Sequence, residues 1–262
     1  MSHPYVLIAR RRSTLQGCYM DEAPLDCCAG EEAMFLGVCG HLEGSHQLHQ
    51  TGREELREGL RIAAGDDYEP SLEMLQTLGA ISDLESSYGR GWSGQMVGSN
   101  NWGAITCPGY NKETGTCPPG CSPNKDSSPY SGEYVTCFRR YATPADGAAG
   151  LITLLSKWPE VIAAIESGNL DEVSWTMRQR NYYLGFKSDP REAAREHAGA
   201  LEKRTKEIAE AMGEPLRAWR KGEDWTPGDG DGSSSNLASK VAKGAVVVAF
   251  VAAVSAWAFR RK

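Results

Sequence analysis

The segment "SLEMLQTLGAISDLESSYGRGW", residues 71–92, joins an amphipathic helix pattern to a run of glycines, with one glutamate close to the junction. Pro70 and Ser71 are typical of a helix start, and Gly89 is typical of a helix C-cap. The apolar residues between them recur at the spacing of one helix face: Leu72, Leu75, Leu78, Ile81 and Leu84. The segment therefore predicts a helix that ends shortly after Glu85.

Glu85 falls in the last turn of this predicted helix, on the same face as Leu78 and Ile81. Apolar neighbours and the negative end of the helix dipole both disfavour a charged carboxylate there. A glutamic acid kept neutral can donate a proton to a leaving oxygen, so Glu85 is the candidate general acid. A structural carboxylate bound to backbone amides is the alternative. Asp83, two residues earlier, is expected to be solvated.

The composition favours one globular domain with appendages. The chain has 262 residues, of which 40% are hydrophobic and 24% are charged, and this is enough for a sizeable core. Its net charge is -6, and no stripe of basic residues interleaved with aromatic ones occurs. We therefore expect no nucleic-acid partner, and no motif predicts a cofactor.

Further helical segments are predicted in the second half of the chain. Thr143 is a typical N-cap, with Pro144 at the first helical position. The stretches "PEVIAAIESG" and "LDEVSWTMRQ" predict two short helices separated by Gly168 and Asn169. The stretch "DPREAAREHAGALEKRTKEIAEAM" predicts a long amphipathic helix with Ala194, Leu201, Ile208 and Met212 on its buried side.

The segment from Cys107 to Tyr141 interrupts this helical pattern. It is rich in proline, glycine and serine, and then turns to "EYVTCFRRY", which alternates like a strand. We therefore predict an α+β domain, mostly helical, that carries a small β-lobe insert. The lobe's cysteines, which suit disulfides but leave free thiols and a metal site open, are Cys107, Cys117, Cys121 and Cys137. A bond between Cys107 and Cys137 would close the base of the lobe.

Residues 1–66 show no clean periodicity, and we assign them no function. Cys39, His41, His46 and His49 lie close enough in sequence to suggest zinc, but a solvent-facing turn is the simpler interpretation, and no metal is predicted. Residues 67–221 are expected to form the folded domain.

The C-terminal part changes character twice. Residues 222–236, "GEDWTPGDGDGSSSN", predict a flexible linker. Residues 237–262 contain an apolar run that ends in Arg260, Arg261 and Lys262. The run is about 16 residues long against the roughly 20 that a bilayer needs, but snorkelling lysines can extend it. We predict a single-pass membrane anchor with the domain outside the cytoplasm, in the periplasm, at the cell surface or in a virion; a buried core helix is the alternative.

Several pieces of the sequence occur in the order seen in one enzyme family. "LESSYGRG" is followed by "SNNWGAI", then by "CFRRYATPADGAAGLITLL" and "RNYYLGFKSDPREAA". Over about 110 residues this order resembles the autolysin and flagellar-type N-acetylglucosaminidases, glycoside hydrolase family 73, within the lysozyme-like peptidoglycan hydrolases. The cysteine-rich lobe departs from that family's pattern.

The resemblance implies a lysozyme-like domain that cleaves the glycan strand of peptidoglycan, with Glu85 as the general acid. Tyr183, or Tyr182 beside it, would stand opposite Glu85 near the developing positive charge. A second carboxylate is usual in glycosidases, and Glu133 is the best candidate, although the substrate's acetamido group could replace it. The residues that would shape the sugar-binding groove are Asn100, Asn101 and Trp102; a structural turn is the alternative for them.

Two other functions remain open on the same sequence. A muramidase or lytic transglycosylase would use the same lone glutamate, and a transglycosylase would leave an anhydro-sugar product. A non-catalytic wall-binding or virion structural protein would keep the fold only to bind peptidoglycan.

Overall fold

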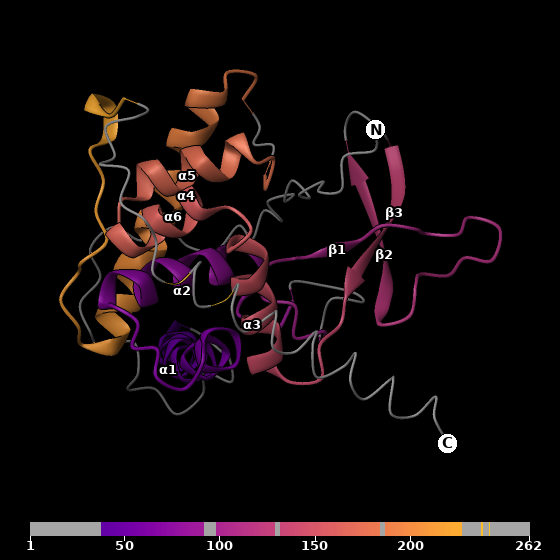
Figure 1. The fold of residues 1–262 in the computed structure, drawn as a ribbon, viewed down its shortest axis with the longest axis horizontal. Coiled ribbons are helices and arrows are strands. Elements are labelled where there is room, and N and C mark those ends of the chain that lie inside the picture. Colours follow the sequence, from indigo (N-terminus) through magenta and orange to yellow (C-terminus); the bar gives the residue numbers. More distant parts are fainter. Residues whose placement is uncertain are drawn as a thin grey trace, which may run out of the picture.

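The computed structural model describes residues 38–91, 98–128, 132–183 and 187–226, together with Leu237 and Val241. The described chain is mostly helical and has one small antiparallel sheet, so the predicted α+β class is confirmed. Figure 1 shows the helices gathered into one body, with the sheet standing beside it. The elements are α1 (Val38–Ala64), α2 (Leu72–Ser86), β1 (Thr106–Cys107), β2 (Cys121–Ser128), β3 (Gly132–Arg139), α3 (Pro144–Leu155), α4 (Pro159–Ser167), α5 (Leu170–Gln179), α6 (Pro190–Met212) and the short 3₁₀ turn η2 (Gly222–Asp224).

The helix α2 lies at the centre of the body and follows the prediction closely. Ser71 is its N-cap, and the Ser71 hydroxyl accepts a hydrogen bond from the Met74 backbone N–H. Leu75, Leu78 and Ile81 are fully buried, as their spacing predicts. The helix ends earlier than expected, because Ser87 and not Gly89 is the left-handed C-cap residue. Glu85 is therefore one residue from the end of α2.

The other predicted helices are also confirmed. Thr143 and Asp146 form a reciprocal capping box at the start of α3. Gly168, in the left-handed region, ends α4, and the Asn169 side chain caps α5. Leu201 and Ile208 on α6 lie in the common core.

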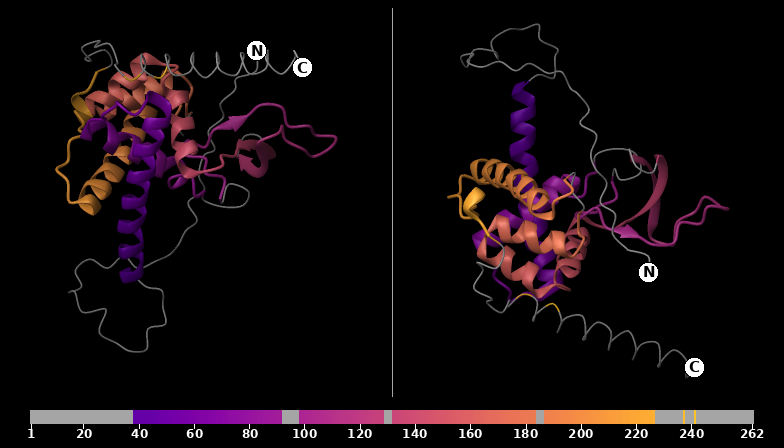
Figure 2. Two further views of the ribbon diagram at one scale, coloured as in Figure 1. Left: turned by 60° about the horizontal axis from the view of Figure 1, so that its bottom comes forward. Right: turned by 90° about the horizontal axis from the view of Figure 1, so that it is seen from above.

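The helix α1 extends this body beyond the predicted range of residues 67–221. Leu56 and Leu60 of α1 belong to the same core as α2 and α3. Gly59 packs directly on α3, since a Cβ atom on Gly59 would lie 2.5 Å from the Cβ of Ala148. One end of α1 projects past the other helices (Figure 2). Part of the segment left without a function in the sequence therefore belongs to the folded body.

The sheet has the strand order β1-β3-β2. β2 and β3 form a hairpin that pairs from Cys121–Arg139 to Ser128–Gly132. β1 adds two residues to the outer edge of β3. The Arg139 N–H donates to the Ile105 carbonyl at 2.9 Å, so the base of the hairpin is attached to the body beside β1.

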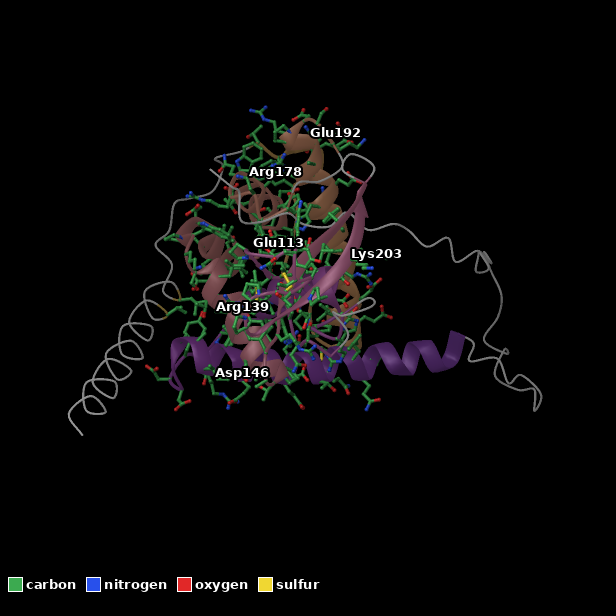
Figure 3. All side chains as sticks on the ribbon, turned by 90° about the vertical axis from the view of Figure 1, so that its right-hand side faces the viewer. Glu113, Arg139, Asp146, Arg178, Glu192 and Lys203 are labelled. Carbon is green, nitrogen blue, oxygen red and sulfur yellow. A yellow bond between two sulfur atoms is a disulfide. The ribbon has the colours of Figure 1, made fainter. Side chains whose placement is uncertain are left out.

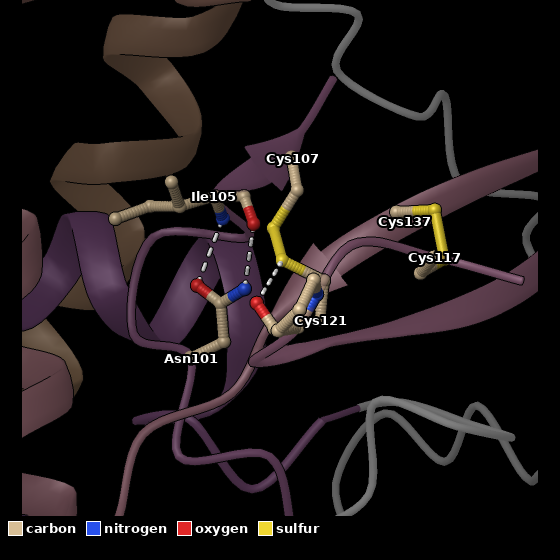
Figure 4. The surroundings of a disulfide bond; sticks show 7 residues. Asn101, Ile105, Cys107, Cys117, Cys121 and Cys137 are labelled. Carbon is tan, nitrogen blue, oxygen red and sulfur yellow. Dashed lines mark hydrogen bonds between the residues drawn. A yellow bond between two sulfur atoms is a disulfide. The ribbon is translucent and has the colours of Figure 1, made fainter. Parts of the chain in front are cut away.

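Two disulfides stabilise this lobe, which confirms the disulfide reading of its cysteines. Cys107 bonds to Cys121, and Cys117 bonds to Cys137 (Figure 4). A Cys107–Cys137 bond does not form, although these two residues face each other in the ladder. Loops of 14 and 20 residues imply about 3 kcal/mol of stabilisation for each bond from the loss of chain entropy in the unfolded state.

The predicted membrane anchor, residues 237–262, lies outside the described residues apart from Leu237 and Val241. Both side chains are buried in the core of the domain. In the described part of the chain no single helix is long and apolar enough to cross a bilayer, and α3 and α4 pass that test only together, as a pair bent by 114°.

Candidate active site

The end of α2 is fastened to the loop that carries the "SNNWGAI" sequence. The hydroxyls of Ser82 and Ser86 both donate to the Trp102 carbonyl, at 3.0 and 2.8 Å. The Ser86 oxygen also accepts from the Gly89 N–H at 2.9 Å. Gly89 has a positive φ, and a Cβ there would lie 2.7 Å from the Asn100 backbone. The last turn of α2, which bears Glu85, is therefore held against residues 100–102.

A second set of contacts joins this loop to the start of α3. The Asn100 amide donates to the Tyr141 carbonyl at 3.1 Å, and the Tyr141 N–H donates to the Ser99 carbonyl. A Cβ on Gly147 would lie 1.7 Å from the Asn100 carbonyl oxygen, so only glycine fits there. Asn100 is half-buried and links two segments of the site, which favours the structural alternative for its amide.

Glu85 is half-buried and lies close to both tyrosines named in the sequence. Burial raises the pKa of Tyr182 well above its ordinary value, and the nearby charges of Glu85 and then Tyr141 raise it further. Burial also raises the pKa of Tyr183; Arg178 opposes this rise and Glu85 adds to it. The structure therefore brings together Glu85 and the tyrosines that are 97 and 98 positions later in the chain.

Neither tyrosine is a surface residue. The Tyr182 hydroxyl donates to the Gly103 carbonyl at 3.2 Å, and the Tyr183 hydroxyl donates to the Ser174 carbonyl at 2.7 Å. Both side chains are buried. Both hydroxyls are therefore used in hydrogen bonds that hold segments of the body together.

Asn101 and Trp102 are also part of the core. The Asn101 side chain exchanges two hydrogen bonds with the Ile105 backbone, at 2.8 and 2.9 Å (Figure 4). Trp102 has 0% of its surface exposed and packs edge-on against Tyr88. Trp102 has no exposed ring face on which a sugar could stack. Its predicted role in shaping the sugar-binding groove is therefore corrected: the ring packs in the core of the domain.

Glu133 lies near the tip of the β2–β3 hairpin, where its backbone pairs with Ser127. Arg139, at the base of the same strand, is six residues away, or about 20 Å in an extended strand. Paired catalytic carboxylates in glycosidases stand about 5 to 9.5 Å apart. This position does not support Glu133 as the partner of Glu85.

The structure adds Tyr141, which the sequence analysis did not single out. Tyr141 lies close enough to Tyr182 to contribute to the rise of the Tyr182 pKa, and burial raises the pKa of Tyr141 itself, although the hydrogen-bonded Arg139 opposes that rise. Figure 3 shows Arg139 and Arg178 on the same face of the molecule. Arg139 hydrogen-bonds Tyr141, and Arg178 lies close enough to Tyr183 to oppose the rise of its pKa. The "FRRY" motif contains both Arg139 and Tyr141, and it was the sequence signal that could have identified these two residues.

The prediction that Asp83 is solvated is wrong, because its side chain is buried. Its carboxylate forms a 3.2 Å ion pair with Arg204 of α6. Burial lowers the pKa of the neighbouring His49, against the opposing effect of Asp83, and His49 hydrogen-bonds the Tyr88 hydroxyl at 2.8 Å. This cluster joins α1, α2 and α6, so His49 has a structural role and Asp83 is a fixed charge within the body.

The imidazole ring of His197 packs against the Tyr183 ring. The two rings stack with their centroids 4.0 Å apart, and His197 Nδ1 hydrogen-bonds the Ser174 hydroxyl. Burial lowers the pKa of His197 to about 3, against about 6.5 for an exposed histidine. The folded chain therefore keeps His197 neutral at pH values where the unfolded chain protonates it.

This difference predicts an acid-sensitive stability. Between about pH 6.5 and pH 3 the unfolded chain binds one more proton at this position, so stability falls as pH falls, by about 1.4 kcal/mol per pH unit. Urea unfolding of the full-length chain at pH 7, 6, 5 and 4 should therefore give a shallower pH slope for His197→Phe. His46→Phe, at an exposed histidine, should keep the parent slope. Equal slopes for the parent and His197→Phe would contradict this account.

A hollow of about 480 Å³ lies elsewhere, between the start of α6 and η2. It is lined by charged residues of both signs, among them Lys187, Glu192 and Arg220. None of the predicted site residues lines it, so it is not part of the candidate active site.

No protein-family model, curated protein or solved structure matches this chain.

Proposed function

We propose that the protein is a membrane-anchored peptidoglycan hydrolase with a lysozyme-like domain, in which Glu85 is the general acid. One observation carries the proposal. The sequence pieces around Glu85, Asn100, Tyr141 and Tyr182 meet at the end of α2, although they come from four separate parts of the chain. A half-buried carboxylate at such a junction is suited to proton transfer.

The reaction is hydrolysis of the glycan strand beside N-acetylglucosamine. Glu85 donates its proton to the glycosidic oxygen as the bond from that oxygen to the anomeric carbon breaks. Water then forms a new bond to the anomeric carbon and gives one proton back to the Glu85 carboxylate. The substrate's own acetamido oxygen stabilises the anomeric centre, because Glu133 lies near the far end of the hairpin. Arg139 and Arg178 place positive charge beside Tyr141 and Tyr183, which suits a polymer whose stem peptides and lactyl groups carry carboxylates.

The buried residues of the site give Glu85 a fixed position. Ser82 and Ser86 bind the Trp102 carbonyl, and Tyr182 binds the Gly103 carbonyl. These bonds hold α2, the 99–105 loop and the segment after α5 as one unit. Such positioning reduces the entropy that must be lost on the way to the transition state. The domain works outside the cytoplasm, on the glycan strands that surround the membrane holding its C-terminal segment.

A digest of purified peptidoglycan with the full-length chain in detergent tests this function. We expect soluble fragments whose mass spectra show reducing N-acetylglucosamine ends. Reducing muramic acid ends would instead identify a muramidase, and anhydromuramic ends a lytic transglycosylase. Intact glycan strands under every condition, with the chain sedimenting on the polymer, would identify a non-catalytic wall-binding protein.

A further inference from the structure

The segment between α6 and η2 exposes large apolar side chains next to basic ones. Leu216 and Trp219 are 45% and 43% exposed. Arg217 between them and Lys221 after them are exposed as well. Tryptophan and arginine side by side are typical of protein surfaces that meet the headgroup region of a bilayer.

This exposed segment is rigidly attached to the body. The Gln76 side chain of α2 donates to the Pro215 carbonyl and accepts from the Arg217 and Ala218 N–H groups. The Trp219 N–H donates to the Gly168 carbonyl, and the Trp219 carbonyl accepts from the Leu170 N–H. The backbone of Trp219 is therefore fixed at the end of α4, while its ring remains exposed to solvent.

Leu237, which precedes the C-terminal apolar run in the sequence, contacts the same end of α4. The Leu237 N–H donates to the Glu166 carboxylate at 3.2 Å, and Glu166 lies two residues before Gly168. Leu237 and Val241 are buried, and the uncharged run predicted to enter a bilayer begins three residues after Val241, at Gly244. The exposed Leu216–Trp219 surface therefore lies beside the start of the predicted anchor.

We infer that Leu216, Arg217 and Trp219 form a lipid-binding surface that rests on the membrane holding the C-terminal segment. The two apolar side chains enter the interfacial layer, and the Arg217 guanidinium binds lipid phosphates. Burial of these two large side chains strengthens the membrane contact. This inference rests on the membrane anchor of the proposed function, which would bring a bilayer within reach of the surface.

This contact would also orient the candidate active site. The first half of α2 lies beside the lipid-binding surface, where Gln76 contacts it, and its last turn bears Glu85. Glu85 is nine positions after Gln76, which corresponds to about 14 Å along the helix. In Figure 1 the segment after α6 and the sheet lie on opposite sides of the helical body. The lobe would then face away from the lipid, toward the surrounding wall.

Fluorescence quenching by brominated lipid tests the contact without using activity. The full-length chain is reconstituted into vesicles of phosphatidylglycerol and phosphatidylcholine, with the phosphatidylcholine either brominated or not. The emission of Trp219 is obtained as the difference between the parent and Trp219→Phe. We expect brominated lipid to remove most of this difference emission. The difference between the parent and Trp102→Phe, at a fully buried ring, should be equal in both vesicles.

The outcomes separate a bilayer from other occupants. Trp219 difference emission that is the same in both vesicles would overturn the proposal. A second result would also overturn it. If brominated lipid quenches Trp219 only after the protein is diluted in the vesicles, a second copy of the chain covers this surface at the higher protein density. Glu85→Gln should show the same quenching as the parent, so failure of the catalytic proposal would leave this result unchanged.

Discussion

Glu85→Gln is expected to lower the rate of peptidoglycan cleavage by about 10² to 10⁴-fold, the usual contribution of a positioned general acid. Glutamine keeps the size and hydrogen bonding of the side chain but has no proton to give to the leaving oxygen. The half-buried position at the end of α2 should accept the amide, because the last turn is held mainly by Ser82 and Ser86. The loss of rate should therefore appear without a loss of fold.

The measurement is release of soluble fragments from purified peptidoglycan, with circular dichroism as the check on folding. Glu73→Gln is the matched control, since Glu73 is also half-buried on α2, but in its first turn beside Gly168. We expect Glu73→Gln to keep the parent rate. A Glu85→Gln variant that cleaves as fast as the parent would falsify the assignment of the general acid.

Trp102→Ala is expected to lower the free energy of unfolding by about 3 to 5 kcal/mol, as for other fully buried aromatic side chains. Trp102 is 0% exposed, packs edge-on against Tyr88, and approaches Gly89 and Gly147 closely. An alanine would leave a cavity between α2 and α3. Since the Trp102 carbonyl holds the turn that bears Glu85, activity should fall together with stability.

Urea unfolding of the full-length chain measures this effect, and Trp219→Ala provides the matched control. Trp219 is 43% exposed, so the same truncation there should change the free energy of unfolding by less than about 1 kcal/mol. If Trp102→Ala kept full stability and lost only affinity for glycan, the indole would be a sugar platform, as the sequence first indicated, and not a core residue.

Local signals in the sequence predicted most of the helices. The Ser71 cap, the Thr143–Asp146 capping box and the Gly168–Asn169 boundary each depend on side chains within a few residues of the helix end. α1 was missed for a physical reason: it packs partly through glycines. Gly52 contacts the Tyr88 ring, and Gly59 contacts α3, so these positions of the buried face, one between Leu56 and Leu60 and one before them, carry no side chain, and the apolar periodicity is too sparse to make the helix visible in the sequence.

The site was predicted less completely, because its contacts join distant parts of the chain. Asp83 has the sequence signal of an ordinary surface carboxylate, because its ion-pair partner, Arg204, lies 121 positions later in the chain. An aromatic residue such as Tyr182 gives the same sequence signal in a core as in a groove. The cysteine pairing likewise depends on the strand register, which no local pattern specifies.

Both disulfides in the described part of the chain lie in the β-lobe, whereas the described contacts of the helical body are apolar packing, hydrogen bonds and ion pairs such as Asp83–Arg204. Oxidation therefore acts on the described chain mainly through the lobe. Under reducing conditions the contacts of the body around Glu85 would persist, while the lobe would lack the two crosslinks that tie β1 and residue 117 to the β2–β3 hairpin. A hydrolase made in this way would be least able to hold its polymer while still inside the cell that produced it.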